Sequence, residues 1–141
     1  MPKIDRIAAL NRLLQIHYRS LPMYLSSARP WVPRGHEKAL ETLELIVEDQ
    51  KRTVEKISDE LLSAGADIDT GEFPMVYTDL HDLSVDYLLT ELVESQRNDV
   101  AAIEDCVVDL GGDPLAQEAL GAAKGHLESL EEAVADVAAQ H

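Results

Sequence analysis

Residues 66–77 read ADIDTGEFPMVY, and this stretch decides the fold because it is long, lacks a helical period and carries Gly71 and Pro74. An extended chain covers about 3.3 Å per residue, so a segment of this size reaches roughly 40 Å. A helix of about thirty residues has the same length, at about 1.5 Å per residue. The segment can therefore cross a whole helical bundle and leave the helices on either side of it parallel.

Amphipathic helices are predicted on both sides of this connector. They are expected at residues 3–28, 36–64 and 79–110, and from residue 113 onward. In each of them apolar residues recur at spacings of three and four, which places them on one helix face. The order predicts an all-α chain: a four-helix bundle of two helical hairpins joined by a long crossover, forming one domain over residues 1–141.

Several residues are typical of helix ends. Gly65 is expected to stop the second helix, and Gly111 the third, because glycine readily adopts the left-handed conformation found after a helix. Asp113 and Pro114 fit the N-cap and the first position of the fourth helix. Thr78 is the expected N-cap of the third helix.

Two residues of the first hairpin receive individual predictions. Pro22 lies within the apolar pattern of the first helix and should kink it, because proline lacks the backbone N–H and clashes with the preceding turn. Trp31, in the stiff turn that follows, is expected to plug one end of the bundle.

The first half of the chain resembles the bacterioferritins, within the ferritin-like family. The run LNRLLQIHYRSLPMYLSSA at residues 10–28 is similar in character to that family's first helix, and VEDQKRTVEKISDELLSAGAD at residues 47–67 resembles the helix that carries its first Glu-x-x-His motif. The C-terminal hairpin, made of the third and fourth predicted helices, matches more loosely. The resemblance implies a ferritin-like four-helix bundle, and in that family a di-iron centre between the helices.

Most of the family's metal ligands are replaced in this sequence. By alignment, His17 stands at the first carboxylate position, while Gln50 and Thr53 replace the first Glu-x-x-His pair. The third helix offers Glu94 by simple alignment, or Gln96 by its apolar stripe.

In the fourth helix the corresponding pair is Ala123 and His126, or Leu127 and Leu130 if the preceding loop is longer. No Glu-x-x-His motif occurs in the sequence, so the di-iron centre is expected to be lost and no cofactor is predicted. Lys51 occupies the place of the haem-binding methionine, so no haem is implied.

The polar residues at these positions have two interpretations. The first is a hydrogen-bonded polar layer in the core, made by His17, Gln50, Thr53 and Gln96, because buried polar groups need partners. The second is an altered site for one metal ion, iron or zinc, using His17, Glu94 and His126. Gly121 and Gly125 flank His126 and suggest close helix contact or a small pocket.

Composition restricts the function further. The formal net charge of −15 argues against nucleic acid and anionic membrane surfaces, which are bound mainly through Lys and Arg. The single cysteine, Cys106, is expected to be a small buried residue. The first residues already form an amphipathic helix without a signal-peptide pattern, so a cytoplasmic location is expected. No catalytic triad, P-loop or dinucleotide-binding motif is found.

Three functions remain from different classes: a non-catalytic binding or structural module, a metal-binding protein with the altered site, and a small-molecule carrier with a cavity near Pro22. An unidentified protein partner or small ligand fits the first and third. A homodimer is also expected, through the outer faces of the first two helices. It is suggested by apolar residues outside their core stripes, namely Leu13, Ile16, Leu25, Leu40, Val47 and Val54.

Overall fold

The computed structural model describes residues 3–27, 37–70 and 84–139. Its elements are helices: α1 (Lys3–Tyr18), α2 (Leu21–Ser27), α3 (Glu37–Ser63), α4 (Val85–Asp109) and α5 (Pro114–Ala139). The chain is therefore all-helical in the part described, as the sequence predicts. The expected positions of Trp31, Thr78 and connector residues 71–77 lie outside the described residues.

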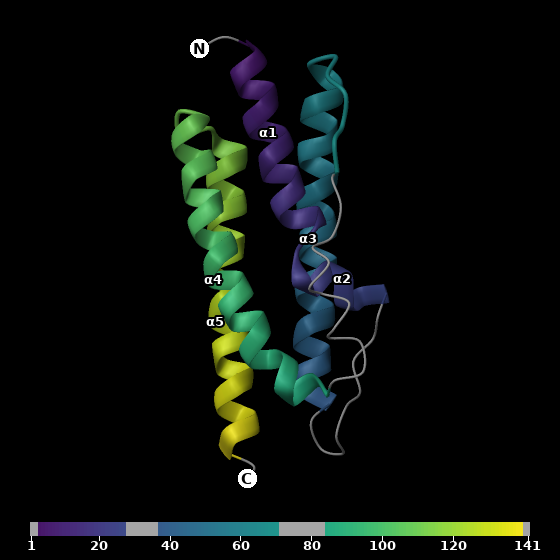
Figure 1. The fold of residues 1–141 in the computed structure, drawn as a ribbon, viewed down its shortest axis with the longest axis vertical. Helices are drawn as coiled ribbons and strands as arrows, with labels where there is room; N and C mark the ends of the chain where they lie inside the picture. Colours follow the sequence, from purple (N-terminus) through teal and green to yellow (C-terminus); the bar gives the residue numbers. More distant parts are fainter. Residues whose placement is uncertain (1–2, 28–36, 71–83, 140–141) are drawn as a thin grey trace.

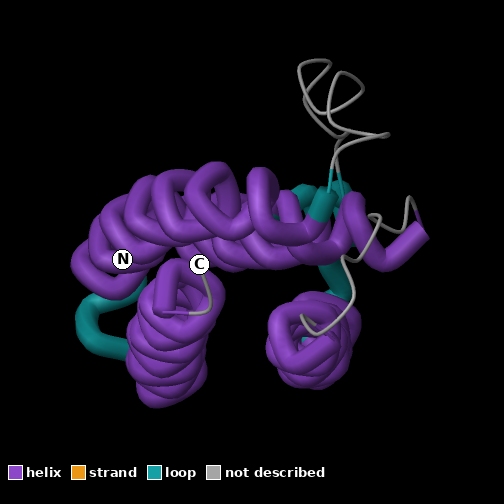
Figure 2. The backbone as a smooth tube through the Cα atoms, turned by 90° about the horizontal axis from the view of Figure 1, so that it is seen from below, coloured by secondary structure: helices purple, strands orange, loops and turns teal. Residues whose placement is uncertain are grey.

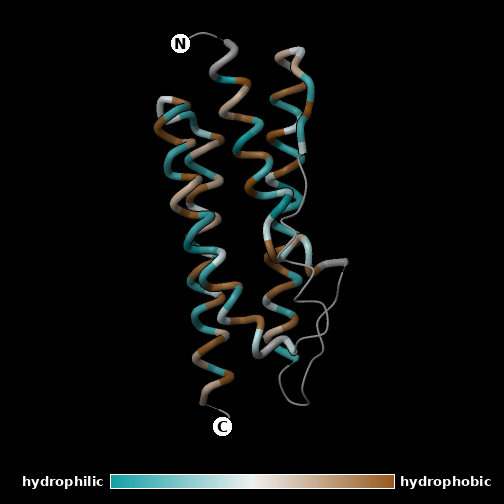
Figure 3. The backbone as a smooth tube through the Cα atoms, viewed as in Figure 1, coloured by the Kyte–Doolittle hydropathy of each residue, from teal (hydrophilic) through white to brown (hydrophobic). Residues whose placement is uncertain are grey.

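The long helices run in two opposite directions. Figure 1 shows α1 and α5 running one way and α3 and α4 running the other, so α3 and α4 are parallel. Helices α1 and α5 each pack against both α3 and α4. Figure 2 gives the view from below, with the C-terminal end of α5 near the viewer. Figure 3 shows hydrophobic and hydrophilic residues alternating along every helix, as expected for helices that bury only one face.

The first predicted helix is in fact two helices, which corrects the expectation of a continuous kinked helix over residues 3–28. The chain leaves the helical path at Arg19 and Ser20 and starts again at Leu21. Ser20 acts as the N-cap of α2, because its Oγ accepts a hydrogen bond from the backbone N of Met23 at 3.4 Å. Pro22 thereby falls in the first turn of α2, where a missing N–H costs little.

The other helix ends follow the sequence closely. Asp113 caps α5 through a 2.9 Å hydrogen bond that Oδ1 accepts from the backbone N of Leu115. Gly65 and Gly111 have positive φ angles of 71° and 62° just after α3 and α4. The start of α4 is the exception: the helix begins at Val85 and Ser84, in an extended conformation, serves as its N-cap, so the expected continuous helix from residue 79 with Thr78 as its N-cap is wrong.

The start of the connector lies along α1. Asn11 donates to the carbonyl of Asp67 at 3.2 Å and accepts from the backbone N of Asp69 at 2.9 Å. Gln15 donates to the carbonyl of Asp69 at 3.1 Å. These bonds supply partners to backbone groups that have no strand or helix of their own, so the side chains of α1 direct the path of residues 67–69.

The core consists of two apolar clusters, one toward each end of the bundle. The upper cluster, at the end where α1 starts, contains Leu10, Leu13, Leu14, Ile57, Leu61, Val100, Ile103, Cys106, Ala116, Ala119 and Ala123. The lower cluster contains Leu21, Leu25, Ala39, Leu43, Ile46, Val47, Leu88, Leu89, Leu92, Val93, Leu130 and Ala133. Cys106 is fully buried, as the sequence suggests, and burial raises the pKa of its thiol.

The surface basis for the expected homodimer is not present in this fold. Leu13, Leu25 and Val47 are buried in the two clusters of the chain's own core. Ile16, Leu40 and Val54 are partly buried and pack against the same clusters. These six residues take part in the internal seam of the bundle, so they do not support the expected dimer.

Candidate functional site

Four buried polar residues lie where the two apolar clusters meet. His17, Ser20, Gln50 and Gln96 are between 2% and 3% exposed. Along every helix they fall between residues of the upper cluster and residues of the lower cluster. We call these four residues the polar layer. Three of them, His17, Gln50 and Gln96, were expected in the core from the sequence, whereas Ser20 was not.

Two bonds of the polar layer tie neighbouring helices together. In the described residues no hydrogen bond joins any two of the four residues that the sequence predicted for the layer, His17, Gln50, Thr53 and Gln96. The hydroxyl of Ser20 donates to Oε1 of Gln50 at 3.0 Å and so joins the α1–α2 break to α3. Nε2 of Gln96 donates to the carbonyl of Ala123 at 3.0 Å and joins α4 to α5. Nδ1 of His17 donates to the carbonyl of Leu13 within its own helix at 2.9 Å. Burial lowers the pKa of His17, which favours the neutral imidazole.

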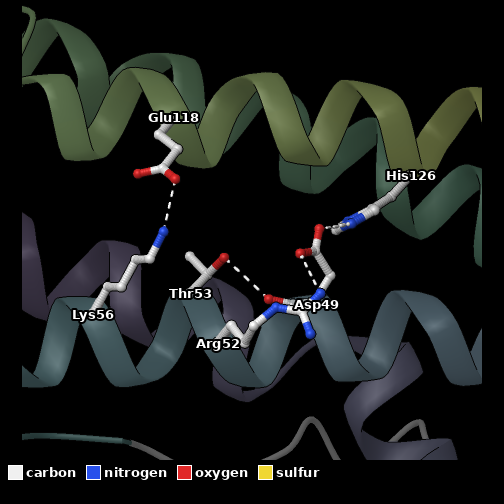
Figure 4. A network of polar contacts seen from close by, with 6 residues as sticks. All are labelled: Asp49, Arg52, Thr53, Lys56, Glu118 and His126. Atoms are coloured by element: carbon white, nitrogen blue, oxygen red, sulfur yellow. Dashed lines mark hydrogen bonds and ion pairs between the residues drawn. The ribbon is translucent and has the colours of Figure 1, made fainter.

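An aspartate–histidine pair connects α3 and α5 beside this layer. Nε2 of His126 lies 2.6 Å from Oδ2 of Asp49, and Arg52 donates to Oδ1 of the same carboxylate at 3.1 Å (Figure 4). Burial alone would raise the pKa of Asp49, but the hydrogen bonds from His126 and Arg52 outweigh it and lower that pKa. One turn of α3 further along from Arg52, Lys56 bridges to Glu118 of α5 at 2.7 Å.

The remaining candidate residues are placed differently from one another. Thr53 is half-buried, and its hydroxyl donates to the carbonyl of Asp49 at 3.2 Å. Glu94 is exposed on α4, whereas His17 is buried. His126 contacts Asp49, a residue that the sequence alignment did not single out because it precedes the expected position at Gln50.

The glycines beside His126 do not make room for a close helix contact. A Cβ atom built on Gly121 or Gly125 would meet no heavy atom within 4 Å. Both glycines are exposed. The expectation of a tight contact or pocket at these two glycines is therefore wrong, because they face away from the neighbouring helices.

The donor chemistry at the family's metal positions does not fit a di-metal centre. Gln50 and Gln96 are neutral amides, and the carboxylate next to Gln50 in the sequence, Asp49, already accepts hydrogen bonds from His126 and Arg52. Across residues 3–27, 37–70 and 84–139, no group of three or more His, Cys, Asp or Glu side chains is arranged to hold a metal ion. Two iron ions would need several free carboxylates to balance their charge.

A second buried acceptor lies one turn beyond Gln96. Oδ2 of Asp99 and Oε1 of Gln96 are both buried without a hydrogen-bond partner in the described part of the chain. Burial raises the pKa of Asp99 to about 7. The two residues are three positions apart on α4 and therefore lie on the same side of the helix.

A groove of about 890 Å³ runs between the first half of α3 and the second half of α5. Asp49 and His126 line it together with charged residues and a few apolar ones. A smaller hollow of about 340 Å³ lies beside Leu25 of α2 and α3. Pro22, near which the carrier hypothesis places a cavity, lines neither of these two spaces.

No protein family, curated protein or solved structure matches the chain. None of the helices in the described residues has the length and apolar character needed to cross a membrane.

Proposed function

We propose that this chain is a ferritin-like bundle whose di-metal centre has been replaced by the polar layer, and that it acts as a non-catalytic binding or structural module. The observation that carries the proposal is the pair of amides, Gln50 and Gln96, buried at the level between the two apolar clusters. A side-chain amide can donate and accept hydrogen bonds but carries no charge. In a buried position its hydrogen bonds can be made by other protein groups, whereas a buried carboxylate would need a cation to balance its charge.

The pattern of bonds supports a structural role for this layer. The hydrogen bond from Ser20 to Gln50 joins the break between α1 and α2 to α3. The hydrogen bond from Gln96 to the carbonyl of Ala123 joins α4 to α5. A buried hydrogen bond between two helices forms only when both partners lie at the same height in the bundle. If one helix shifted along its axis, the buried polar groups would lose their partners, and each unpaired group would cost about 1–3 kcal/mol of stability. The polar layer therefore favours one register of the four long helices.

Metal analysis of protein purified without a tag tests the proposal. We expect no stoichiometric iron, and no oxygen-dependent oxidation of Fe(II) above the rate without protein, because the ligand positions hold neutral amides. Two iron ions per chain with ferroxidase activity would overturn it.

The same experiment tests the alternative of a single altered metal site. One equivalent of zinc or iron, lost when His17 or His126 is replaced by Ala, would establish a metal-binding protein instead. A matched Glu94→Gln variant shows whether the third expected ligand takes part, and its exposed position in the structure predicts no effect.

A further inference from the structure

The groove between α3 and α5 has an inner end at the middle of the bundle and an outer part toward the C-terminal end of α5. Its inner end is marked by the Asp49–His126 pair, and Arg52 lies beside it. From there it follows α3 back to Lys38 and α5 forward to Ala139. At about 1.5 Å per residue, both walls are roughly 20 Å long, which is the length of a helix of about 14 residues.

The outer part of the groove carries an excess of negative charge. Glu41 of α3 and Glu132 and Asp136 of α5 line it, and in the described part of the chain none of the three has a hydrogen-bond or ion-pair partner. Lys38 lies at the outer end. Unpaired carboxylates on both walls make this groove a region of negative potential, in a chain of net charge −15.

Between these charges the groove has an apolar strip. Ala39, Ile46 and Ala133 are buried on its floor. Leu45 lies on its lip with 71% of its surface exposed, and half-buried Val137 lines the opposite wall. Charged walls and an apolar floor match a partner with an apolar stripe flanked by cations.

We propose that this groove binds a basic amphipathic helix of a partner protein. The apolar face of that helix would cover Leu45 and Val137 above the buried floor, and its Lys or Arg residues would pair with Glu41, Glu132 and Asp136. A second copy of this chain is a poor occupant, because two molecules of net charge −15 repel one another. This groove proposal shares with the proposed function only the idea that the chain is a binding module. It does not depend on whether the chain binds a metal ion.

The full chain can be tested with a synthetic helical peptide of about 14 residues in which Leu occupies one face and Lys the other. Fluorescence anisotropy would measure its binding at fixed salt, and a peptide with Glu in place of Lys is the control for charge. We expect the lysine peptide to bind and the glutamate peptide not to bind. The variant Glu132→Lys/Asp136→Lys should weaken binding by about tenfold or more, because two attractive contacts become repulsive.

A matched variant separates specific docking from general attraction to an acidic protein. Glu94→Lys/Glu104→Lys makes the same change in net charge at two exposed positions of α4 outside the groove. It should weaken binding by no more than about threefold, through long-range electrostatics alone. An equal loss in both double variants would overturn the proposal.

The apolar part of the proposed contact is tested with a second pair of matched variants. Leu45→Ala should weaken binding several-fold, whereas Leu62→Ala, which is 60% exposed on α3 outside the groove, should have no effect. Unchanged binding by Leu45→Ala would contradict helix docking in the groove. Circular dichroism of each variant confirms that the bundle is intact. Finding iron in the protein would defeat the proposed function without changing these peptide results.

Discussion

Asp99 is a carboxylic acid in a position suited to a neutral residue. Its Oδ2 is buried without a partner in the described part of the chain, and burial raises its pKa from 3.8 to about 7. In the unfolded chain the same group ionises near pH 4. Between these two values the folded state binds more protons than the unfolded state, so the contribution of Asp99 to stability falls as pH rises from about 4 to about 7.

Replacing this residue should therefore stabilise the protein in a pH-dependent way. Asp99→Asn removes the ionisable group, and at pH 8 we expect the free energy of unfolding to rise by roughly 1–3 kcal/mol. The gain should be smaller at pH 5 and absent below about pH 4, where the wild-type carboxyl is protonated in both states. Urea unfolding of wild type and variant at pH 5 and pH 8 measures the difference.

Glu104→Gln provides the control, because Glu104 is an exposed acid on the same helix. It should change stability by less than about 0.5 kcal/mol at either pH. A gain for Asp99→Asn that does not vary with pH would show that the carboxyl stays ionised in the folded protein.

At the scale of the helix, the residues at the helix ends determine where each helix starts and stops. Gly111 has a φ of 62° where α4 ends, and a Cβ there would meet no atom within 4 Å. Gly121 also has open space around it, but it lies within α5 and is not among the glycines with positive φ. The two glycines therefore differ in backbone conformation while their surroundings are equally open.

This difference predicts opposite results for the same substitution. Gly111→Ala should lower the free energy of unfolding by about 1 kcal/mol, because alanine is strained at positive φ. Gly121→Ala should raise it by roughly 0.5–1 kcal/mol, because alanine is the better helix former. Thermal or urea unfolding of the two variants is the measurement, and a loss of stability in Gly121→Ala would mean that this glycine has a close neighbour after all.

The elements were largely predictable because their signals are local. Asp113 with Pro114, Gly65 and Gly111 each specify a helix end through their own backbone preferences. The break at Ser20 was not predicted, because the apolar spacing continues through it and conceals the cap.

The candidate site was predictable only in part. His17, Gln50 and Gln96 follow from the apolar stripes, since each interrupts one. The pairing of Asp49 with His126 joins residues 77 positions apart, and it depends on how α3 rotates against α5. Helical periodicity determines which face is buried but leaves that rotation uncertain by a residue, which is enough to exchange Asp49 for Gln50.

For the molecule as a whole, the net charge of −15 is the dominant surface property. Salt bridges such as Arg6 to Asp113 at 2.9 Å and Arg97 to Glu131 at 3.1 Å connect helices at the surface. Exposed pairs of this kind contribute little, typically below about 1 kcal/mol. We therefore expect the repulsion among the excess carboxylates to outweigh these pairs and to oppose the compact state.

Salt should accordingly stabilise the bundle. Raising NaCl from about 0.02 M to 0.5 M shortens the screening length to a few ångströms, and we expect the free energy of unfolding to increase. The less acidic variant Glu94→Lys/Glu104→Lys should show a smaller increase and a higher stability at low salt. Urea unfolding at both salt concentrations tests this, and a decrease with salt would show that attractive ion pairs dominate.

The division of the core has a consequence for cooperativity. The upper cluster draws its side chains from α1, α3, α4 and α5, and the lower cluster draws them from α2, α3, α4 and α5. Only the three long helices α3, α4 and α5 are continuous across the polar layer, whereas the first hairpin is interrupted there at Ser20. We therefore expect α2 to detach from the lower cluster without unwinding α1, so that its backbone amides exchange faster than those of α1.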